Sequence, residues 1–399
     1  IRRDMGGIHN VVLLLLALAR VGNSRDECKD AFLHGRGAQG YPEHVKGLNQ
    51  TERYGSIVAC GNQTVLVTRK VSGVDRAGHD TYVNLVRFRE GSYIFGYPAE
   101  LGGLSLLSHN MAQDCLENGT LVVYGGQDET GKMALRYRQD RGIRRATAHI
   151  GAQITRPDQL RFSPGPIVLS GNPSDTKCVE RRSKFPHCQF DGLLSLVRLN
   201  GKLLLYARAN AVSEVNRAEP KMFNGIGGRW SQVARSSDEG LTWEPFRLIS
   251  IAGVGIAAEN NVYFVTVSRT FNHGVGAHQL VALFPAILKG AGGVFMATSN
   301  DGYHFSQPIR IMTSEIIQQR TPDHPISARD LPGGKVEVII QHNVKLAKVA
   351  TRKRTFLCRY ELEGDWSQEP RRQRLRRLHR HRNRKRGKPG VRSRSSTLG

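Results

Sequence analysis

The sequence lacks the motifs that mark several common protein classes. It contains no Walker A loop, dinucleotide-binding fingerprint, GxSxG elbow or HExxH pair, which excludes the most frequent nucleotide-binding and hydrolytic motifs. Its six cysteines form no CxxC pair and no Cys/His cluster with zinc spacing. The apolar run at residues 11–19 has nine residues, whereas a membrane-spanning helix needs about 20. We therefore predict no metal, no cofactor and no transmembrane helix.

The same apolar run, VVLLLLALA, lies near the N-terminus and is followed by the small and polar residues Val21 to Ser24. This order is typical of the hydrophobic core and cleavage zone of a secretory signal peptide. Residues 1–24 are therefore predicted to be a signal-peptide-like segment. The alternative is a buried strand or a short helix.

Two further features agree with a secretory or extracellular location. Sequons for N-glycosylation begin at Asn49, Asn62 and Asn118, and the number of cysteines is even. Cys178 and Cys188 are ten residues apart, a separation that suits a local disulfide across a loop. Six cysteines allow 15 pairings, so the sequence leaves the connectivity open.

Positive charge is concentrated at the C-terminus. Residues 371–399 contain 13 Lys and Arg and no acidic residue, more than half of the net charge of +24. With no aromatic residue and four large aliphatic ones, this tail is predicted to be disordered. It could bind anionic polymers, or it could be a solvated arm without a defined role. Because base stacking requires aromatic rings, no specific nucleic-acid binding is predicted.

Between about residues 50 and 365, short β-rich runs alternate with Gly, Asn, Asp and Pro, and no long amphipathic helix is evident. The predicted class is all-β. The clearest hairpin covers 193–209, where Asn200-Gly201 suits a type I′ turn. Further hairpins are predicted over 254–269, turning at Asn260-Asn261, and over 327–343, turning at Gly333-Gly334.

A repeated segment indicates the architecture. SSDEGLTWEPFRLI (236–249) matches TSNDGYHFSQPIRI (298–311), and a weaker copy covers 155–169. The aspartate can accept hydrogen bonds from turn amides, the glycine permits a left-handed backbone and the aromatic ring can wedge the hairpin against its neighbour. A structural role is predicted for Ser236, Asp238, Gly240, Trp243, Asp301, Gly302 and Phe305.

Ser236 to Trp243 match S-x-D-x-G-x-T-W at every fixed position and so resemble the Asp-box (BNR) repeat of the sialidase superfamily of β-propellers. The resemblance implies that these turns join the outer strands of a blade, away from an active site. Residues 170–370 also look like a broader group of glycosidase-like propeller proteins. The 63-residue spacing of Asp238 and Asp301 predicts a five- or six-bladed β-propeller over residues 25–370, followed by the disordered basic tail.

In a propeller, the innermost strand of each blade lines a central channel, so functional side chains are expected near the start of each repeat. Glycoside hydrolysis usually requires two carboxyl groups. Asp191 and Asp323 are the predicted catalytic pair, with Glu259 in reserve. The alternative for each is an acid that caps a turn.

Arginine and histidine candidates lie near the same positions. Arg208, Arg229 and Arg320 would suit an anionic sugar, because a guanidinium group binds carboxylate or sulfate through two hydrogen bonds. Three arginines are similar to the carboxylate-binding triad of sialidases, but that family's R-I-P element and its Tyr/Glu pair have no match here. His109, His324 and His342 could bind sugar hydroxyls, or could be ordinary hydrogen-bonded histidines.

The predicted function is a secreted, sialidase-like or glycoside hydrolase-like propeller that acts on or binds carbohydrate, possible ligands being acidic or sulfated glycans. The alternative is a non-catalytic propeller that binds glycan or protein.

Overall fold

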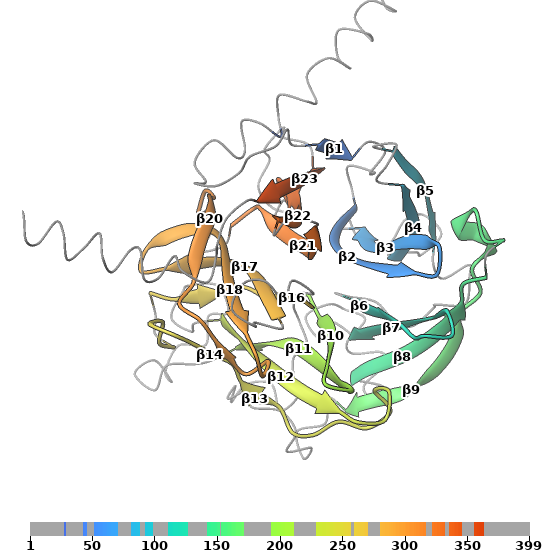
Figure 1. Cartoon of the computed structure of the whole chain (residues 1–399), viewed down its shortest axis with the longest axis horizontal. Coiled ribbons are helices and arrows are strands. Elements are labelled where there is room, and N and C mark those ends of the chain that lie inside the picture. Colours follow the sequence, from blue (N-terminus) through green and yellow to red (C-terminus); the bar gives the residue numbers. More distant parts are fainter. Residues whose placement is uncertain are drawn as a thin grey trace, which may run out of the picture.

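Five antiparallel sheets stand radially around a common axis in the computed structural model (Figure 1). The all-β propeller prediction is confirmed, and of the two blade numbers left open the correct one is five. The predicted boundaries at residues 24 and 370 fall outside the described residues, as does the tail. The structure describes residues 28, 43–45, 52–70, 81–87, 92–98, 111–126, 142–151, 153–170, 193–210, 229–256, 259–269, 280–316, 321–331, 335–344 and 355–362.

The first three blades each contain four strands in sequence order, from the centre of the ring outwards. Blade 1 contains β2 (Glu52–Cys60), β3 (Gln63–Lys70), β4 (Thr81–Arg87) and β5 (Ser92–Pro98). Blade 2 contains β6 (Ala112–Cys115), β7 (Thr120–Gly126), β8 (Gly142–His149) and β9 (Ser163–Ser170). Blade 3 contains β10 (Ser195–Leu199), β11 (Lys202–Asn210), β12 (Arg229–Ser236) and β13 (Arg247–Leu248).

The last two blades depart from this simple order. In blade 4 the innermost position is shared by two short strands that both pair with β17. Its strands are β15 (Asn261–Val262), β16 (Thr266–Arg269), β17 (Leu280–Leu288), β18 (Ala291–Ser299) and β20 (Ile309–Thr313). Blade 5 contains β21 (His324–Leu331), β22 (Lys335–His342), β23 (Phe356–Leu362) and β1 (Glu43–Val45). Two short segments, β14 (Ser250–Ile251) and β19 (His304–Phe305), pair in parallel outside the blades.

The N-terminal part of the chain closes the ring. β1 pairs with β23 and so supplies the outermost strand of blade 5, whose other three strands come from the C-terminal part of the chain. A disulfide between Cys28 and Cys358 ties the same two parts together, and a second one, Cys60–Cys115, joins the innermost strands of blades 1 and 2. Cys178 and Cys188, predicted to pair locally, lie outside the described residues. No helix in the described ranges is long and apolar enough to cross a membrane.

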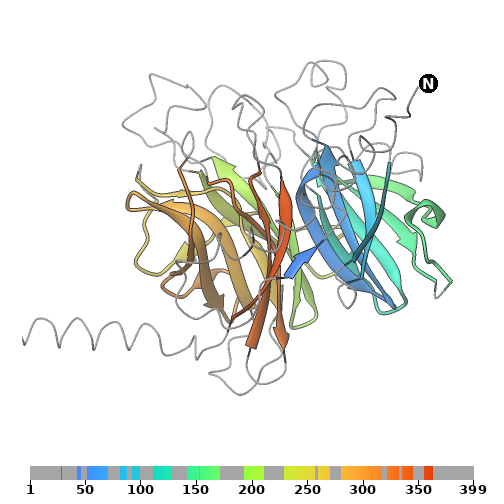
Figure 2. The same cartoon turned by 90° about the horizontal axis from the view of Figure 1, so that it is seen from above.

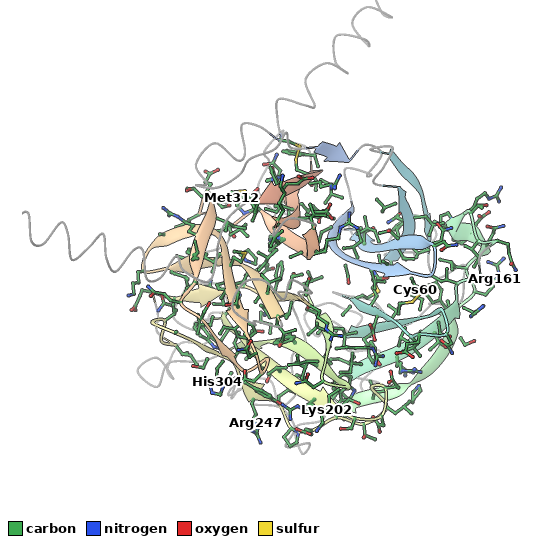
Figure 3. All side chains as sticks on the ribbon, viewed as in Figure 1. Cys60, Arg161, Lys202, Arg247, His304 and Met312 are labelled. Atoms are coloured by element: carbon green, nitrogen blue, oxygen red, sulfur yellow. A yellow bond between two sulfur atoms is a disulfide. The ribbon has the colours of Figure 1, made fainter. Side chains whose placement is uncertain are left out.

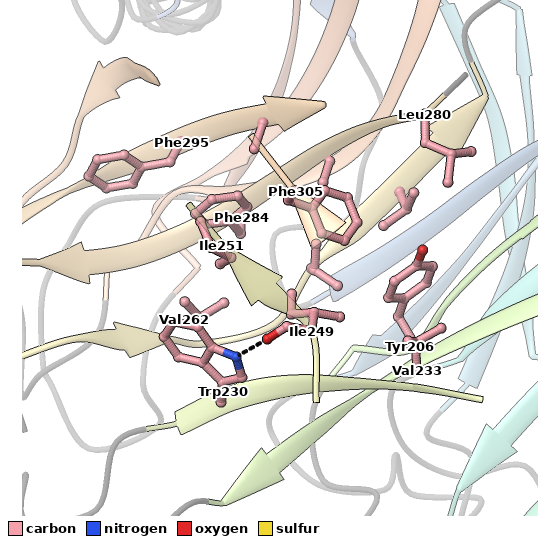
Figure 4. Close-up of a cluster of buried hydrophobic side chains, with 14 of the residues drawn as sticks. Tyr206, Trp230, Val233, Ile249, Ile251, Val262, Leu280, Phe284, Phe295 and Phe305 are labelled. Carbon is pink, nitrogen blue, oxygen red and sulfur yellow. Dashed lines mark hydrogen bonds between the residues drawn. The ribbon is translucent and has the colours of Figure 1, made fainter. Parts of the chain in front are cut away.

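The blades stand side by side around the ring, seen down its axis in Figure 1 and from above in Figure 2. Apolar side chains fill the space between neighbouring blades. Figure 4 shows the cluster between blades 3 and 4, in which Trp230, Phe284 and Phe305 are buried. The indole N–H of Trp230 donates a hydrogen bond to the carbonyl of Ile249 at 2.7 Å, which satisfies its polar atom within the apolar layer. Burial of apolar surface between blades is therefore the main stabilising contact of the ring.

The turn after β12 is organised around Asp238. Its carboxylate accepts hydrogen bonds from the backbone N–H and the hydroxyl of Thr242 and from the hydroxyl of Ser236. The hydrogen bonds from Thr242, with that from Ser236, lower the pKa of Asp238 to about 2. Gly240 has a φ of 77°, and a Cβ there would lie 2.0 Å from the hydroxyl oxygen of Tyr124. The turn after β18 has the same construction around Asp301.

A tyrosine of the preceding blade contacts each of these two turns. Tyr124 of blade 2 donates a hydrogen bond to the carbonyl of Glu239 and lies edge-on to Trp243, with ring centroids 5.9 Å apart. Tyr206 of blade 3 donates in the same way to the carbonyl of Gly302 in the turn of blade 4. The turns therefore join adjacent blades. His304, in the turn of blade 4, lies near the outer edge of the ring in Figure 3, away from the channel.

The third, weaker copy of the segment occupies the equivalent place in blade 2 but is held differently. Asp158 lies in the short 3₁₀ helix η3 (Pro157–Gln159) and forms an exposed ion pair with Arg156. Phe162 is buried among apolar residues of blades 1 and 2. The aromatic position of the repeat is therefore used for packing here, while the aspartate binds a neighbouring guanidinium group.

Two of the three predicted hairpins are correct. β10 and β11 are joined by Asn200 and Gly201, with φ values of 51° and 73°, and β21 pairs with β22. The hairpin predicted over 254–269 is wrong. Asn261 pairs with Ile287 of β17, so this segment leads into the innermost strand of blade 4.

Each blade has four antiparallel strand positions, so the chain leaves a blade at the same end of the ring at which it entered. The innermost strands of all five blades therefore run in the same direction. Side-chain hydrogen bonds join these parallel strands: Ser195 accepts from the N–H of Val267, and Ser268 from that of Ala328. We call the end of the ring where the innermost strands begin the front face, and the end where they finish the rear face.

Removing the disulfide that closes the ring is expected to destabilise the protein more than removing the other one. Cys28–Cys358 spans 330 residues of chain and Cys60–Cys115 spans 55, and cross-links over longer loops restrict the unfolded chain more. The Cys28→Ser/Cys358→Ser variant should lose about 2–5 kcal/mol of unfolding free energy in denaturant titrations. A smaller loss than in the Cys60→Ser/Cys115→Ser variant would contradict this view of ring closure.

Candidate functional site

Two arginines of blade 3 lie against one tyrosine of blade 4 at the front face. Arg229, at the start of β12, pairs with Asn210 of β11, and paired residues project from the same face of a sheet. Arg208 lies two residues before Asn210 on β11 and therefore projects from that face as well. The guanidinium carbons of Arg208 and Arg229 lie 5.6 Å and 5.4 Å from the ring centroid of Tyr263. Both side chains are buried, with residue exposures of 3% and 9%. Stacking on an aromatic ring fixes the direction of each guanidinium plane.

His324 of blade 5 joins this group. Its ring centroid lies 5.6 Å from that of Tyr263 and 5.1 Å from that of Phe264, and its Nε2 lies 3.2 Å from the carbonyl oxygen of Thr321. The structure therefore brings three predicted binding residues together around a ring that was not predicted. We call Arg208, Arg229, Tyr263 and His324 the front cluster.

Asp323 precedes β21, and its carboxylate is held by two side chains of blades 4 and 5. Oδ1 lies 2.7 Å from Nδ1 of His342, and Oδ2 accepts a hydrogen bond from the hydroxyl of Ser314. Nε2 of His342 in turn lies 2.7 Å from the hydroxyl oxygen of Tyr360. His342 is buried and its two ring nitrogens have protein partners, so neither nitrogen is left for a sugar hydroxyl in this arrangement.

These contacts keep Asp323 ionised. Burial would raise the pKa of Asp323, but the hydrogen bond and the charge of His342, together with the hydrogen bond from Ser314, outweigh burial and hold the pKa below its ordinary value. A carboxyl group in this state can stabilise positive charge or act as a base, and it is unsuited to donate a proton at neutral pH.

The remaining predicted site residues are not placed in this group. Glu259 is exposed in the turn before β15, and no described contact joins it to the front cluster or to Asp323. Asp191, Arg320 and His109 lie outside the described residues. Within the described ranges, no three His, Cys, Asp or Glu side chains gather as metal ligands would.

A second polar region lies farther along the channel. It was not predicted, because functional side chains were expected only near the start of each repeat. A cavity of about 420 Å³ is lined mainly by the innermost strands, with Asp114 and Arg198 among the lining residues, and also by Glu337 of β22. Burial raises the pKa of Asp114, and the nearby Arg198 offsets only part of that effect. Arg198 lies inside a hairpin that was predicted, whereas no strand was predicted around Asp114, and nothing in the local sequence marks either residue as lining the channel.

The two tyrosines that organise the front face differ in how predictable they are. Tyr263 lies at the start of an innermost strand, in the same kind of position as the predicted residues, and the same rule could have selected it. Tyr360 lies in β23, two strands from the channel, and nothing in its sequence context marks it.

Comparison with known proteins gives similarity of fold only. No protein-family model and no curated protein matches the chain. The GH43_1 enzyme from Xanthomonas citri in complex with xylose is 12% identical, with a TM-score of 0.48 over 85% of this chain and 92% of that chain. CoXyl43, a GH43 β-xylosidase/α-arabinofuranosidase from a compost microbial metagenome, is 11% identical, with a TM-score of 0.49 over 83% and 96%. The α-L-arabinanase of Cellvibrio cellulosa is 10% identical, with a TM-score of 0.46 over 79% and 93%. At these identities and scores, the likenesses carry no argument about function.

Asp323→Asn is expected to lower the stability of the protein in a pH-dependent way. Because the pKa of Asp323 is depressed in the folded state, its carboxylate stabilises the fold above the unfolded pKa of about 3.9, and this contribution disappears as pH falls through the folded pKa. The variant should lose about 1.5–3 kcal/mol of unfolding free energy at pH 7 and much less near pH 3.

The matched control is Glu259→Gln, which neutralises an exposed acid at the same face and should leave stability unchanged. Urea titrations of both variants at the two pH values measure the difference. Equal stability of Asp323→Asn and the unmodified protein at pH 7 would show that the Asp323–His342 contact contributes nothing.

Proposed function

We propose that this propeller binds carbohydrate at its front face and that the ligand carries an acidic group. The observation that carries the proposal is the convergence of Arg208 and Arg229 on Tyr263, with His324 beside the same ring. These side chains come from three successive blades and meet where the innermost strands begin. Polar groups that converge in this way from separate blades are typical of a ligand site.

The chemistry of the cluster favours an anionic sugar. A guanidinium group can bind carboxylate or sulfate through two parallel hydrogen bonds, and it binds more strongly where water is excluded. The face of an aromatic ring suits the apolar face of a sugar. The match of Ser236 to Trp243 to the Asp-box pattern supports a relation to sialidase-like propellers.

Hydrolysis is the second candidate function, and the ionised carboxylate of Asp323 favours it. An ionised carboxylate suits the role of nucleophile or base, and a second, protonated carboxyl group must then donate to the leaving oxygen. Asp191, which precedes β10 in the sequence, is our candidate for that acid. If the two carboxyl groups lie about 5–10 Å apart, hydrolysis is geometrically feasible; a much larger separation favours binding alone.

Binding is tested on an array of sialylated, uronic-acid-containing, sulfated and neutral glycans. We expect acidic glycans to bind, and Arg229→Gln to weaken binding about tenfold or more, because one charge-assisted contact is lost. The control is Arg161→Gln, which removes the same charge from the outer edge of blade 2 (Figure 3).

The outcomes separate the two candidates. Mass analysis of the bound glycans after incubation detects cleavage, which Asp323→Asn should abolish if Asp323 is catalytic. Binding without any change in glycan mass indicates the non-catalytic function. If no acidic glycan binds, or if Arg161→Gln has the same effect as Arg229→Gln, the front cluster is not the site.

A secretory route predicts N-glycosylation at the rear face. Asn62 and Asn118 are exposed in the turns that follow the innermost strands of blades 1 and 2, and the side-chain oxygen of Asn118 accepts a hydrogen bond from the N–H of Thr120. Protein from a secreting eukaryotic host should lose mass on treatment with peptide N-glycosidase. Asn118→Gln and Thr120→Ala should each abolish the same glycan, since both destroy one sequon. An unchanged mass for the secreted protein would contradict this prediction.

A further inference from the structure

The lining of the channel cavity includes arginines at the rear end of three innermost strands and none of the four residues of the front cluster. Along the innermost strands of blades 3 and 4, the apolar residues Leu193, Tyr263 and Phe264 come first and pack together. The hydroxyl residues Ser195 and Thr266 follow, and arginines come last. The cavity of about 420 Å³ is lined by Leu193, by both hydroxyl residues and by the arginines, and its volume falls within the size range of small-molecule sites.

Three consecutive blades place an arginine at the rear end of the cavity. Arg198, Arg269 and Arg329 come from β10, β16 and β21, near the end of each strand, and all three line the cavity. The hydrogen bond from the N–H of Ala328 to the hydroxyl of Ser268 puts Arg269 and Arg329 at the same level. The side chains of Arg198 and Arg329 are 30% and 50% exposed, and Arg269 is exposed, so the guanidinium groups form the rim.

Acidic side chains hold two of these arginines in place. Arg329 forms an ion pair with Glu337, which is fully buried and also binds Arg359. Arg198 lies 2.7 Å from the carboxylate of Asp114 and hydrogen-bonds to Glu239. Ion pairs of this kind fix the direction of the guanidinium groups and lower the entropy cost of binding a ligand.

The cavity wall also contains a buried acceptor. The amide nitrogen of Gln113 donates to the carbonyls of Ser56 and Val65, the latter at 3.2 Å. These two contacts set the orientation of the amide group, because in the flipped orientation its oxygen would face both carbonyl oxygens and be repelled. Among the described residues, none donates a hydrogen bond to Oε1 of Gln113, and this atom is buried. A buried acceptor without a donor is costly, so the cavity favours a molecule that carries hydroxyl groups.

We propose that the rear cavity binds a hydroxylated carboxylate of monosaccharide size, of the hexuronate class. Its carboxylate group contacts Arg269 and Arg329 at the rim, and its hydroxyl groups donate to Oε1 of Gln113 and to Asp114. This site is separate from the front cluster and does not depend on the function proposed for it.

The probes are D-glucuronate and D-glucose, which have similar size and differ in the carboxylate, and binding is measured by calorimetry at pH 7. Glucuronate should bind about tenfold or more tightly than glucose, because only glucuronate offers a charge-assisted contact to the arginines. Ser327→Leu, which places a larger side chain on the cavity lining, should abolish glucuronate binding.

Arg269→Gln is the second variant, because its side chain is exposed and its substitution leaves the core intact. It should weaken glucuronate binding by about tenfold even if Ser327→Leu does not fold. Arg161→Gln, at the outer edge of blade 2 and in neither candidate site, is the control and should bind glucuronate normally.

Three results would overturn the proposal. The first is absence of glucuronate binding to the unmodified protein, and the second is equal affinity for glucose. The third is glucuronate binding that is weakened by Arg229→Gln and unchanged by Arg269→Gln. In that case the sugar would occupy the front face. Failure of glycan binding at the front face alone would leave the rear cavity unaffected.

Discussion

Closure of the ring by the N-terminal strand is the constraint on which the rest of this structure depends. Each blade can bury its apolar faces only against the two neighbouring blades, so an open arc would expose one face at each end. Pairing of β1 with β23 completes blade 5 and brings it beside blade 1. The Cys28–Cys358 disulfide connects the same two parts covalently. The channel, and with it both candidate sites, exists only in the closed ring.

The closure is also connected to the front face through buried polar groups. The hydroxyl of Tyr360 donates to the carbonyl of Cys28, and Tyr360 in turn contacts His342, which binds Asp323. A chain of hydrogen bonds thus crosses blade 5 from the N-terminal segment to the start of its innermost strand. Such a network holds Asp323 in one position, because a buried carboxylate without its partners would be strongly unfavourable.

The two ends of the channel differ in chemistry although the same strands form both. At the front face, two arginines are buried against an aromatic ring, whereas at the rear face Arg198 and Arg329 are partly exposed and paired with carboxylates. Leu193, which lines the rear cavity, packs with Phe264 and with Tyr263 of the front cluster. A five-bladed ring therefore offers two separate polar environments along one axis.

The sequence by itself determined the fold class and much of its local construction, because these depend on patterns within a few residues. The Asn200-Gly201 turn has the positive φ values that its residues favour, and the segments around Asp238 and Asp301 contain nearly all the groups that form their turns. Only the tertiary structure decided the number of blades, the two disulfide pairings and the contacts of Tyr263, Asp114 and Tyr360. These depend on residues tens to hundreds of positions apart that meet when the ring closes, and no local pattern records which distant partner a side chain will find.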